Sequence, residues 1–426
     1  MMINDLRKDT ILEDGILYLD FTASGLAYQP IEDKLQKILK TYANTHSEVG
    51  YNASIITEYY DKARISLRKT LDIGDDFYII PCGTGATGAI KKFQELMGLY
   101  IPPATKKRYK IDPTSYDLPL VVIGPFEHHS NEVSFREAMC DVVRIPLNDK
   151  ETIDLDALRR VLEENKHREI FGSFAVASNV TGTVNPIEEI YSIMKEYDGK
   201  VCLDAAASSP YMNVDSSHYD AMFLSPHKLL GGPGSCGLLV IRKNLCNCKE
   251  VPTFAGGGTV SYVSRESHTF SEDIETKEDA GTPGILQFIK ASLAYELRNE
   301  IGLEYIKNKD MELKRYFRKG REEVEGIRLY CLASKNKLPI FSFNIDGIDP
   351  YELAQYLSDN YKIQVRSGCS CAGPYGHDLL GFTDNQTFYE KPGWLRVGFH
   401  YTHTTDDIEY FLTSLKESIK EIKAKK

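Results

Sequence analysis

Short runs of apolar residues recur along the first 241 residues of the chain, and longer segments of mixed polarity separate several of them. The mixed segments Leu155–Asn165 and Ile187–Tyr197 place apolar residues three and four positions apart, which is typical of helices with one buried face. Strands that are apolar on both faces are typical of a parallel sheet covered by helices, so the pattern predicts an α/β fold with a mostly parallel sheet. Its strands are expected at Phe77–Ile80, Leu120–Ile123, Val142–Ile145, Ile170–Val176, Val201–Asp204, Ala221–Leu224 and Gly237–Ile241.

The pattern changes from about Gly284 onward. A long helical stretch is predicted from there to Arg321, strands follow at Ile340–Ile345 and Ile363–Arg366, and a last helix begins at Thr405. This mixture favours a second, smaller α+β lobe.

Length and composition limit the fold and the binding partners. The 426 residues, 42% hydrophobic and 26% charged, suffice for a large domain at residues 20–285 and a small domain formed by residues 1–19 and 286–426. The proline- and lysine-rich segment Ile101–Leu118 is predicted to be a loop insertion. A formal net charge of −10 argues against nucleic-acid binding and against an anionic membrane surface.

The sequence also predicts a cytoplasmic location. No apolar run approaches the ~18 residues that span a bilayer, and the first residues lack the apolar core of a secretory signal. Nine cysteines, an odd number, favour reduced thiols over a disulfide framework.

A glycine-rich turn, Gly83–Gly88, follows the first predicted strand and opens a helix. It fits the G-x-G-x-x-G pattern of dinucleotide-binding turns, but the acidic residue expected about twenty residues later is missing, and no Lys-Ser/Thr pair makes it a P-loop. Two hypotheses remain, a purely structural tight turn and a phosphate site, because free N–H groups at the start of a helix bind phosphate.

A lysine, Lys228, ends the segment Ser225-Pro226-His227-Lys228 directly after a predicted strand. Such a lysine can form a Schiff base with pyridoxal 5′-phosphate (PLP), whereas a lone lysine is most often a solvated surface residue. Asp204 ends another strand and precedes three alanines, so its buried carboxylate needs a cation, such as a protonated pyridine nitrogen. The alternative role for Asp204 is a helix N-cap.

Two further motifs place reactive groups after predicted strands or inside them. The side chains of His128 and His129 point to opposite faces of an extended chain, which disfavours a shared metal; stacking on a flat cofactor and a plain surface histidine remain as hypotheses. Arg396 lies inside an apolar strand and needs a carboxylate partner, either in a substrate or in an internal salt bridge.

A flexible, glycine-rich loop, Arg366–His377, carries Cys369 and Cys371. It can present a thiolate to a substrate, because a nearby arginine lowers the pKa of a thiol. A C-x-C pair without further ligands at metal spacing disfavours zinc, so no metal site is predicted, and a buried thiol without function is the alternative.

In this order and spacing, the motifs resemble those of the class V, fold-type I family of PLP-dependent enzymes, most closely the group II cysteine desulfurases and selenocysteine lyases. The resemblance implies a large domain with a mostly parallel seven-stranded sheet between helices, a smaller α+β C-terminal domain, and a homodimer. The motifs that carry it are Tyr18–Ser24, Asn44–His46, Gly83–Gly88, Glu127–His129, Ser178–Asn179, Asp204, Ser225–Lys228, Gly256–Thr259, Ala280–Pro283, Arg366–Cys371 and Arg396.

The resemblance also implies residue roles. Lys228 would bind PLP covalently and move protons, Cys371 would receive sulfur, and His128, the third expected catalytic residue, would stack on the cofactor ring. Arg396 would bind the substrate carboxylate. The other expected cofactor ligands are Ala86, Thr87, Asn179, Asp204, Ser225, His227 and, from the partner subunit, Thr282, and the other expected substrate contacts are Asn44 and His46.

The reaction implied is removal of sulfur from L-cysteine to give alanine and a persulfide on Cys371, with selenocysteine lyase activity as an extension and an acceptor protein or small thiol as the next sulfur carrier. One alternative is another class V enzyme, an aminotransferase, an epimerase or a C–S lyase, in which Cys371 is dispensable. The other is a PLP-binding scaffold without activity. Two departures lie near the substrate, since Ala207 replaces the usual glutamine and Ser47 the usual arginine.

Overall fold

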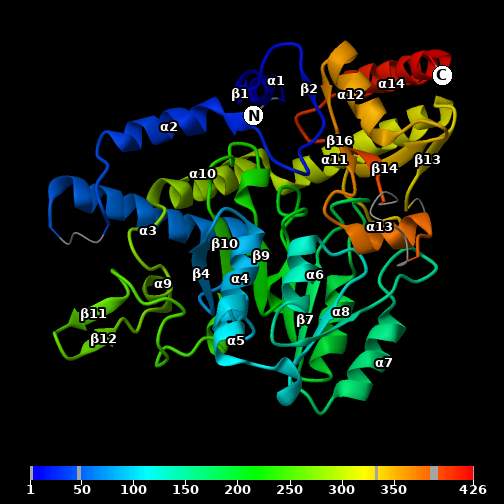
Figure 1. Cartoon of the computed structure of the whole chain (residues 1–426). Helices are drawn as coiled ribbons and strands as arrows, with labels where there is room; N and C mark the ends of the chain where they lie inside the picture. The colour runs from blue at the N-terminus through cyan, green and yellow to red at the C-terminus, as the bar shows by residue number, and fades with distance from the viewer. Residues whose placement is uncertain (1–2, 46–48, 332–333, 384–391, 426) are drawn as a thin grey trace.

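The computed structural model describes residues 3–45, 49–331, 334–383 and 392–425 (Figure 1). A seven-stranded sheet in the order β4-β10-β9-β8-β7-β5-β6 forms its centre. Within this sheet β10 runs antiparallel to both neighbours and the other pairs are parallel, so the predicted mostly parallel α/β sheet is confirmed. Its strands are β4 (Phe77–Cys82), β5 (Leu120–Ile123), β6 (Asp141–Arg144), β7 (Ile170–Ala175), β8 (Lys200–Asp204), β9 (Ala221–Leu224) and β10 (Gly237–Arg242).

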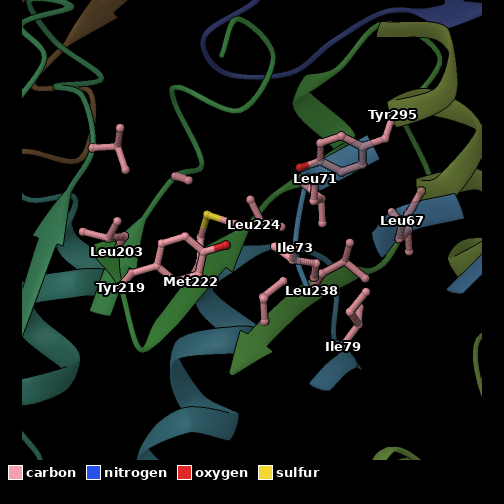
Figure 2. Close-up of a cluster of buried hydrophobic side chains, with 14 of the residues drawn as sticks. Leu67, Leu71, Ile73, Ile79, Leu203, Tyr219, Met222, Leu224, Leu238 and Tyr295 are labelled. Atoms are coloured by element: carbon pink, nitrogen blue, oxygen red, sulfur yellow. The ribbon is translucent and has the colours of Figure 1, made fainter. Parts of the chain in front are cut away.

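Successive side chains of these strands point to opposite faces, and each face has its own apolar cluster. On one face Ile79, Leu203 and Leu224 belong to a cluster that includes Leu67 and Leu71 of α3 (Figure 2). The helices that contribute to this cluster are α1 (Ile3–Lys8), α2 (Gln29–Leu39), α3 (Tyr51–Leu71), α7 (Leu155–Asn165), α8 (Ile187–Lys195) and α10 (Ile285–Ile301). The helices α4 (Ala86–Leu96) and α6 (His129–Arg136) cover the other face.

A second sheet has four antiparallel strands in the order β13-β14-β17-β16. Its strands are β13 (Ile327–Leu329), β14 (Ile340–Ile345), β16 (Arg366–Gly368) and β17 (Trp394–Gly398), and the helices beside it are α11 (Leu303–Gly320), α12 (Pro350–Tyr361) and α14 (Thr405–Lys425). Phe317, Phe341 and Phe399 pack together in a separate core, so the predicted α+β lobe is present.

The chain also contains shorter elements outside the two main sheets and their large helices. They are α1 (Ile3–Lys8), β1 (Thr10–Ile11), β2 (Leu17–Tyr18), β3 (Ala27–Tyr28), α5 (Pro103–Tyr109), β11 (Val260–Val263), β12 (His268–Phe270), α9 (Ile274–Lys277), β15 (Ile363–Gln364) and α13 (Gly373–Leu380). The β11–β12 hairpin projects from the body of the molecule (Figure 1). Among the described residues, no helix combines the length and the apolar character needed to cross a bilayer.

Three predicted elements differ in detail. The helical stretch from Gly284 to Arg321 is broken at Gly302, whose φ of 93° ends α10 and starts α11 in a new direction. The single strand expected at Ile363–Arg366 is divided, because β15 pairs with β2 whereas β16 pairs with β17. The expected loop Ile101–Leu118 contains the helix α5.

Candidate active site

A cavity of about 250 Å³ lies where the strands of the large sheet end. Residues that follow β4, β5, β7, β8 and β9 line it together with Arg366 and Arg396 of the small sheet. Carboxyl ends of parallel strands meet at one edge of a sheet, which explains why motifs far apart in the sequence converge. The predicted site residues that line it are Ala86, Thr87, His128, Asn179, Asp204, Ser225, His227, Lys228, Cys371 and Arg396.

The Lys228 amine and the Asp204 carboxylate are the central charged pair of the cavity. Loss of hydration lowers the pKa of Lys228 from 10.5 to about 8, although the Asp204 carboxylate opposes this shift. Burial also raises the pKa of Asp204, while a hydrogen bond from the Ala206 N–H to its Oδ1 (2.9 Å) opposes the change. The segment after Asp204 is a turn, so this carboxylate caps no helix there and faces the cavity.

The glycine turn brings donors together at the start of α4. The Ala86 N–H donates to Ser225 Oγ (2.8 Å), and the hydroxyls of Thr87 and Ser130 are hydrogen-bonded (2.7 Å). A Cβ on Gly85 would lie 2.9 Å from His227 Cε1 and 3.0 Å from Ser225 Oγ, so a larger residue does not fit. The turn therefore forms a small cradle of N–H and hydroxyl groups at a helix N-terminus, the arrangement that binds phosphate.

The two adjacent histidines have different surroundings. His128 lines the cavity, and its Nδ1 accepts a hydrogen bond from the Ser130 N–H (3.1 Å) at the start of α6. Burial lowers the pKa of His128 to about 3, so its ring is neutral at ordinary pH and can stack on an aromatic cofactor. His129 contacts the cysteine loop instead. Its backbone N–H donates to the Cys371 carbonyl (2.8 Å), and its ring Nε2 accepts from the Gly373 N–H (2.9 Å).

Arg396 is held inside the cavity wall. Its Nη2 donates to Asp20 Oδ1 (2.8 Å), and its Nη1 donates to the Asn179 carbonyl (2.9 Å). Its Nε is buried and has no hydrogen-bond partner among the residues that the structure describes. Arg396 therefore forms the internal salt bridge with Asp20 and also lines the cavity, where it can meet a bound carboxylate.

Cys371 lines the cavity from the tight turn Cys369–Ala372. Its neighbour Ser370 is buried and holds the turn in place, since the Asn179 Nδ2 donates to its carbonyl (2.7 Å) and the Trp394 Nε1 donates to its Oγ (3.2 Å). The loop is therefore fixed to β17 and to the loop after β7, which differs from the flexible loop expected.

Two predicted residues, Asn44 and Thr282, lie outside the cavity. The Asn44 Nδ2 donates to Thr282 Oγ1 (2.9 Å), and both residues are exposed and absent from the lining of the cavity. His46 and the neighbouring Ser47 lie outside the described residues. Asn44 and Thr282 thus form one surface pair, although the sequence assigned them to different ligands.

Some lining or supporting residues received no role from the sequence. Asp20 pairs with Arg396, Ser130 contacts Thr87, and His129 holds the cysteine turn. Asp20 and His129 lie within two of the motifs that carried the resemblance, and this position was the one sign in the sequence that they belong to the site. Across the described residues, no group of three or more His, Cys, Asp or Glu side chains is arranged to hold a metal ion.

The fold and the site are those of a fold-type I PLP-dependent enzyme, with a buried lysine and a carboxylate at the edge of a mostly parallel sheet. The chain belongs to the class-V aminotransferase family, which matches residues 17–411. The enzyme class and the cofactor predicted from the sequence are thereby confirmed.

Similar proteins match the chain over nearly its whole length. A probable cysteine desulfurase of Pyrococcus abyssi is 28% identical and covers 99% of this chain and 98% of its own, and one of Halobacterium salinarum is 29% identical, covering 97% and 94%. The apo structure of a cysteine desulfurase from Thermococcus onnurineus has a TM-score of 0.82 at 25% identity, with 99% of both chains covered. A cysteine desulfurase of Escherichia coli shares the fold, with a TM-score of 0.79 at 22% identity over 99% of both chains.

The residues present fit PLP. The cradle at Gly85 and Ala86 suits the phosphate, the buried Asp204 carboxylate suits a protonated pyridine nitrogen, and the Lys228 amine suits the aldehyde. His128 and Asn179 line the same cavity and complete the expected set from this chain.

Proposed function

We propose that the protein is a cysteine desulfurase, which takes sulfur from L-cysteine, releases alanine and keeps the sulfur as a persulfide on Cys371. One observation carries the proposal: Cys371 lines the same cavity as Lys228, Asp204 and Arg396. The full-length similarity to the two archaeal proteins named as probable cysteine desulfurases supports it.

Each residue of the cavity has a chemical task in this reaction. When bound, PLP supplies an electron sink for the substrate Cα. Asp204 keeps the pyridine nitrogen protonated by charge pairing, and Arg396, with its guanidinium plane fixed by Asp20, binds the substrate carboxylate. Because the pKa of Lys228 is lowered to about 8, its amine is partly neutral near neutral pH and can take the Cα proton.

Cys371 performs the sulfur transfer. Its thiolate attacks the substrate sulfur, the substrate Cβ–S bond breaks, and a Cys371–S–SH persulfide forms while the carbon skeleton gains a proton and leaves as alanine. The turn that carries Cys371 is held by His129 and Asn179, so the thiol approaches the substrate from a defined position. Positioning of this kind increases the rate of a step between two bound groups.

Assembly and partners are part of the same proposal. The protein forms a homodimer in which Thr282 completes the cofactor site of the partner subunit, and an acceptor protein or small thiol takes the sulfur. The exposed position of Thr282, away from the cavity of its own chain, supports this assignment. A cytoplasmic location agrees with nine unpaired cysteines, and selenocysteine would be a second substrate.

A second candidate is C–S lysis of a larger thioether amino acid. Ala207 lines the cavity where the family usually has a glutamine, which removes a polar side chain and leaves more room beside the substrate. In that reaction Lys228 and Arg396 are needed and Cys371 is dispensable.

The test is to incubate the purified holoenzyme with L-cysteine and a reductant and to assay alanine and sulfide. Wild type and Cys248→Ala, which changes an exposed cysteine that does not line the cavity, are expected to form both products, and Cys371→Ala is expected to form neither. Release of sulfide that persists in Cys371→Ala, with pyruvate and ammonia in place of alanine, favours the second candidate. No turnover of L-cysteine by wild type contradicts the proposal.

A further inference from the structure

Cys369 and Cys371 occupy the first and third positions of one tight turn. The Ala372 N–H donates to the Cys369 carbonyl (3.0 Å), and Ser370 and Cys371 have φ values of 52° and 58°. Positive φ at both central positions defines a type I′ turn, which usually requires glycine or asparagine. Each of these residues adopts the left-handed conformation at a cost of about 1–2 kcal/mol, so the surrounding contacts must maintain the turn.

The turn keeps the two cysteine backbones close together. Two peptide units span at most about 7.6 Å between the Cα atoms, and the bend of the turn shortens that distance. Disulfides form where Cα atoms are about 4.4–6.8 Å apart. Between the two cysteines, Ser370 is anchored through its carbonyl and its hydroxyl, so the side chains of Cys369 and Cys371 are the parts of the turn that can rotate.

The two thiols differ in their surroundings. Cys371 lines the cavity, whereas Cys369 does not line it and packs against the apolar cluster that contains Phe126, Tyr330 and Tyr375. Both thiols are half-buried. One cysteine of the pair therefore faces the reacting groups, and the other lies just outside the cavity, where Cys371 would reach it after rotation of its side chain.

We propose that Cys369 is a resolving thiol that discharges the persulfide of Cys371. This inference rests on the proposed desulfurase function. The Cys369 thiolate attacks the Sγ of Cys371, the bond between that Sγ and the outer sulfur breaks, and hydrosulfide leaves with the electron pair. A Cys369–Cys371 disulfide forms, so the outer sulfur is reduced by two-electron transfer from the attacking thiolate, the Cys369 sulfur is oxidised, and the Cys371 sulfur keeps the oxidation state it had in the persulfide. An external thiol or dithiol then reduces this disulfide and restores both thiols.

Proximity within the turn supports this step. Two thiols separated by a single residue react as an intramolecular pair. The effective concentration of one thiol at the other far exceeds the concentration of any free thiol in solution. A disulfide inside so short a loop is strained, and strained or accessible disulfides are the readily reduced ones. When no acceptor protein or small thiol takes the sulfur, the protein would thus release it as hydrosulfide and would need a thiol reductant for the next turnover.

A single turnover without reductant tests the proposal. Fully reduced holoenzyme is mixed with one equivalent of L-cysteine, and alanine, free hydrosulfide and the state of each cysteine are measured, the last by alkylation and mass spectrometry. We expect wild type and the control Cys248→Ser to release about one hydrosulfide per alanine and to contain a Cys369–Cys371 disulfide. We expect Cys369→Ser and Cys369→Ala to form alanine but to retain the sulfur on Cys371, with hydrosulfide release at least tenfold lower.

The outcomes separate this inference from the function on which it rests. Alanine formation by wild type with the sulfur retained on Cys371, or with a persulfide found on Cys369, overturns the resolving role and leaves the desulfurase proposal intact. Hydrosulfide release by Cys369→Ser that equals wild type overturns it as well. If wild type forms no alanine, the desulfurase proposal fails, and the resolving role fails with it. An unchanged visible spectrum of the bound cofactor in Cys369→Ser shows that the variant is folded.

Discussion

The Arg396 guanidinium donates to the Asp20 carboxylate at 2.8 Å, and both residues are buried although 376 positions separate them in the sequence. A buried guanidinium without a partner is costly, so Asp20 makes this arginine acceptable in the wall of the cavity. The Asn179 carbonyl fixes a second nitrogen of Arg396 at 2.9 Å. Together these contacts define the plane in which the guanidinium meets a substrate carboxylate.

We expect Arg396→Lys to raise the KM for L-cysteine at least tenfold, because lysine keeps the charge but loses the planar pair of donors. Asp20→Asn is expected to act in the same direction, since Arg396 then loses its anionic partner. Arg366→Lys is the control: Arg366 lies 4.0 Å from Asp20 and is half-exposed, so its effect should be several-fold smaller. Steady-state kinetics measure all three variants, and an unchanged KM in Arg396→Lys contradicts the carboxylate role.

The lowered pKa of Lys228 predicts the pH dependence of cofactor capture. A neutral amine attacks an aldehyde and an ammonium does not, so the rate of covalent PLP attachment to apoprotein should rise with pH and level off above about 8. Rapid-mixing absorbance measurements between pH 6 and about 9.5 follow this reaction. A rate that continues to rise toward pH 10.5 would show an amine with an ordinary pKa, and Lys228→Ala should show no covalent attachment.

Asp204→Asn should change stability in opposite directions in the apoprotein and the holoprotein. Burial raises the pKa of Asp204, so the folded apoprotein retains a proton that the unfolded chain releases, and its stability falls as pH rises from about 4 toward that raised pKa. Asparagine removes this cost, and we expect the apoprotein of the variant to be more stable than wild type at pH 7. In the holoprotein the carboxylate has a cationic partner, so the same variant should be less stable than wild type.

Thermal unfolding with and without PLP measures both effects. Asp215→Asn is a matched control, because the exposed Asp215 also accepts a hydrogen bond from an N–H two residues later, at 2.9 Å. We expect it to show no dependence on the cofactor. If Asp204→Asn shifts both forms in the same direction, Asp204 does not face the pyridine nitrogen.

His129 should act as a positioning residue for Cys371. Its ring Nε2 accepts from the Gly373 N–H, whereas its backbone N–H donates to the Cys371 carbonyl. Removal of the ring leaves the backbone bond in place and releases the Gly373 side of the turn. We expect His129→Ala to lower kcat about tenfold and to change the alkylation rate of Cys371, with the cofactor spectrum unchanged. His129→Gln, which keeps an acceptor, should recover much of both values. A loss of cofactor binding in His129→Ala would instead indicate a structural role.

Local pattern was sufficient for the large sheet. Apart from the edge strand β6, its strands are largely buried on both faces, and their apolar runs are clear in the sequence. The observed limits lie within two residues of the predicted ones, as β5 (Leu120–Ile123) and β9 (Ala221–Leu224) illustrate. The break at Gly302 was not predicted because the helical spacing of apolar residues continues across it, and one glycine only weakens a helix.

Contacts between distant segments could not be predicted from local sequence pattern, unlike the strands of the large sheet. The motif around Arg396 indicated that it needs a carboxylate, but only the folded chain identifies Asp20. His129 and Gly373 meet across 244 positions, and the hydrogen bond between Asn44 and Thr282 spans 238. Such pairs depend on how the lobes and loops pack, which no local periodicity encodes.

The surface pair of Asn44 and Thr282 leads to a prediction about mixed dimers. Thr282 is exposed and does not line the cavity of its own chain. In the proposed homodimer it would therefore serve the partner's cofactor site, together with Asn44, which is hydrogen-bonded to it.

Homodimers of Lys228→Ala should be inactive, and homodimers of Thr282→Val should bind PLP at least several-fold more weakly. In a mixed dimer, the Lys228 of the Thr282→Val chain would meet the intact Thr282 of the Lys228→Ala chain. One complete site per dimer is therefore restored, and PLP titration of differently tagged, co-purified chains should reveal it as a wild-type affinity at half occupancy. If the mixed dimers bind PLP as weakly as Thr282→Val alone, Thr282 serves its own chain or no cofactor site, and the composite site is wrong.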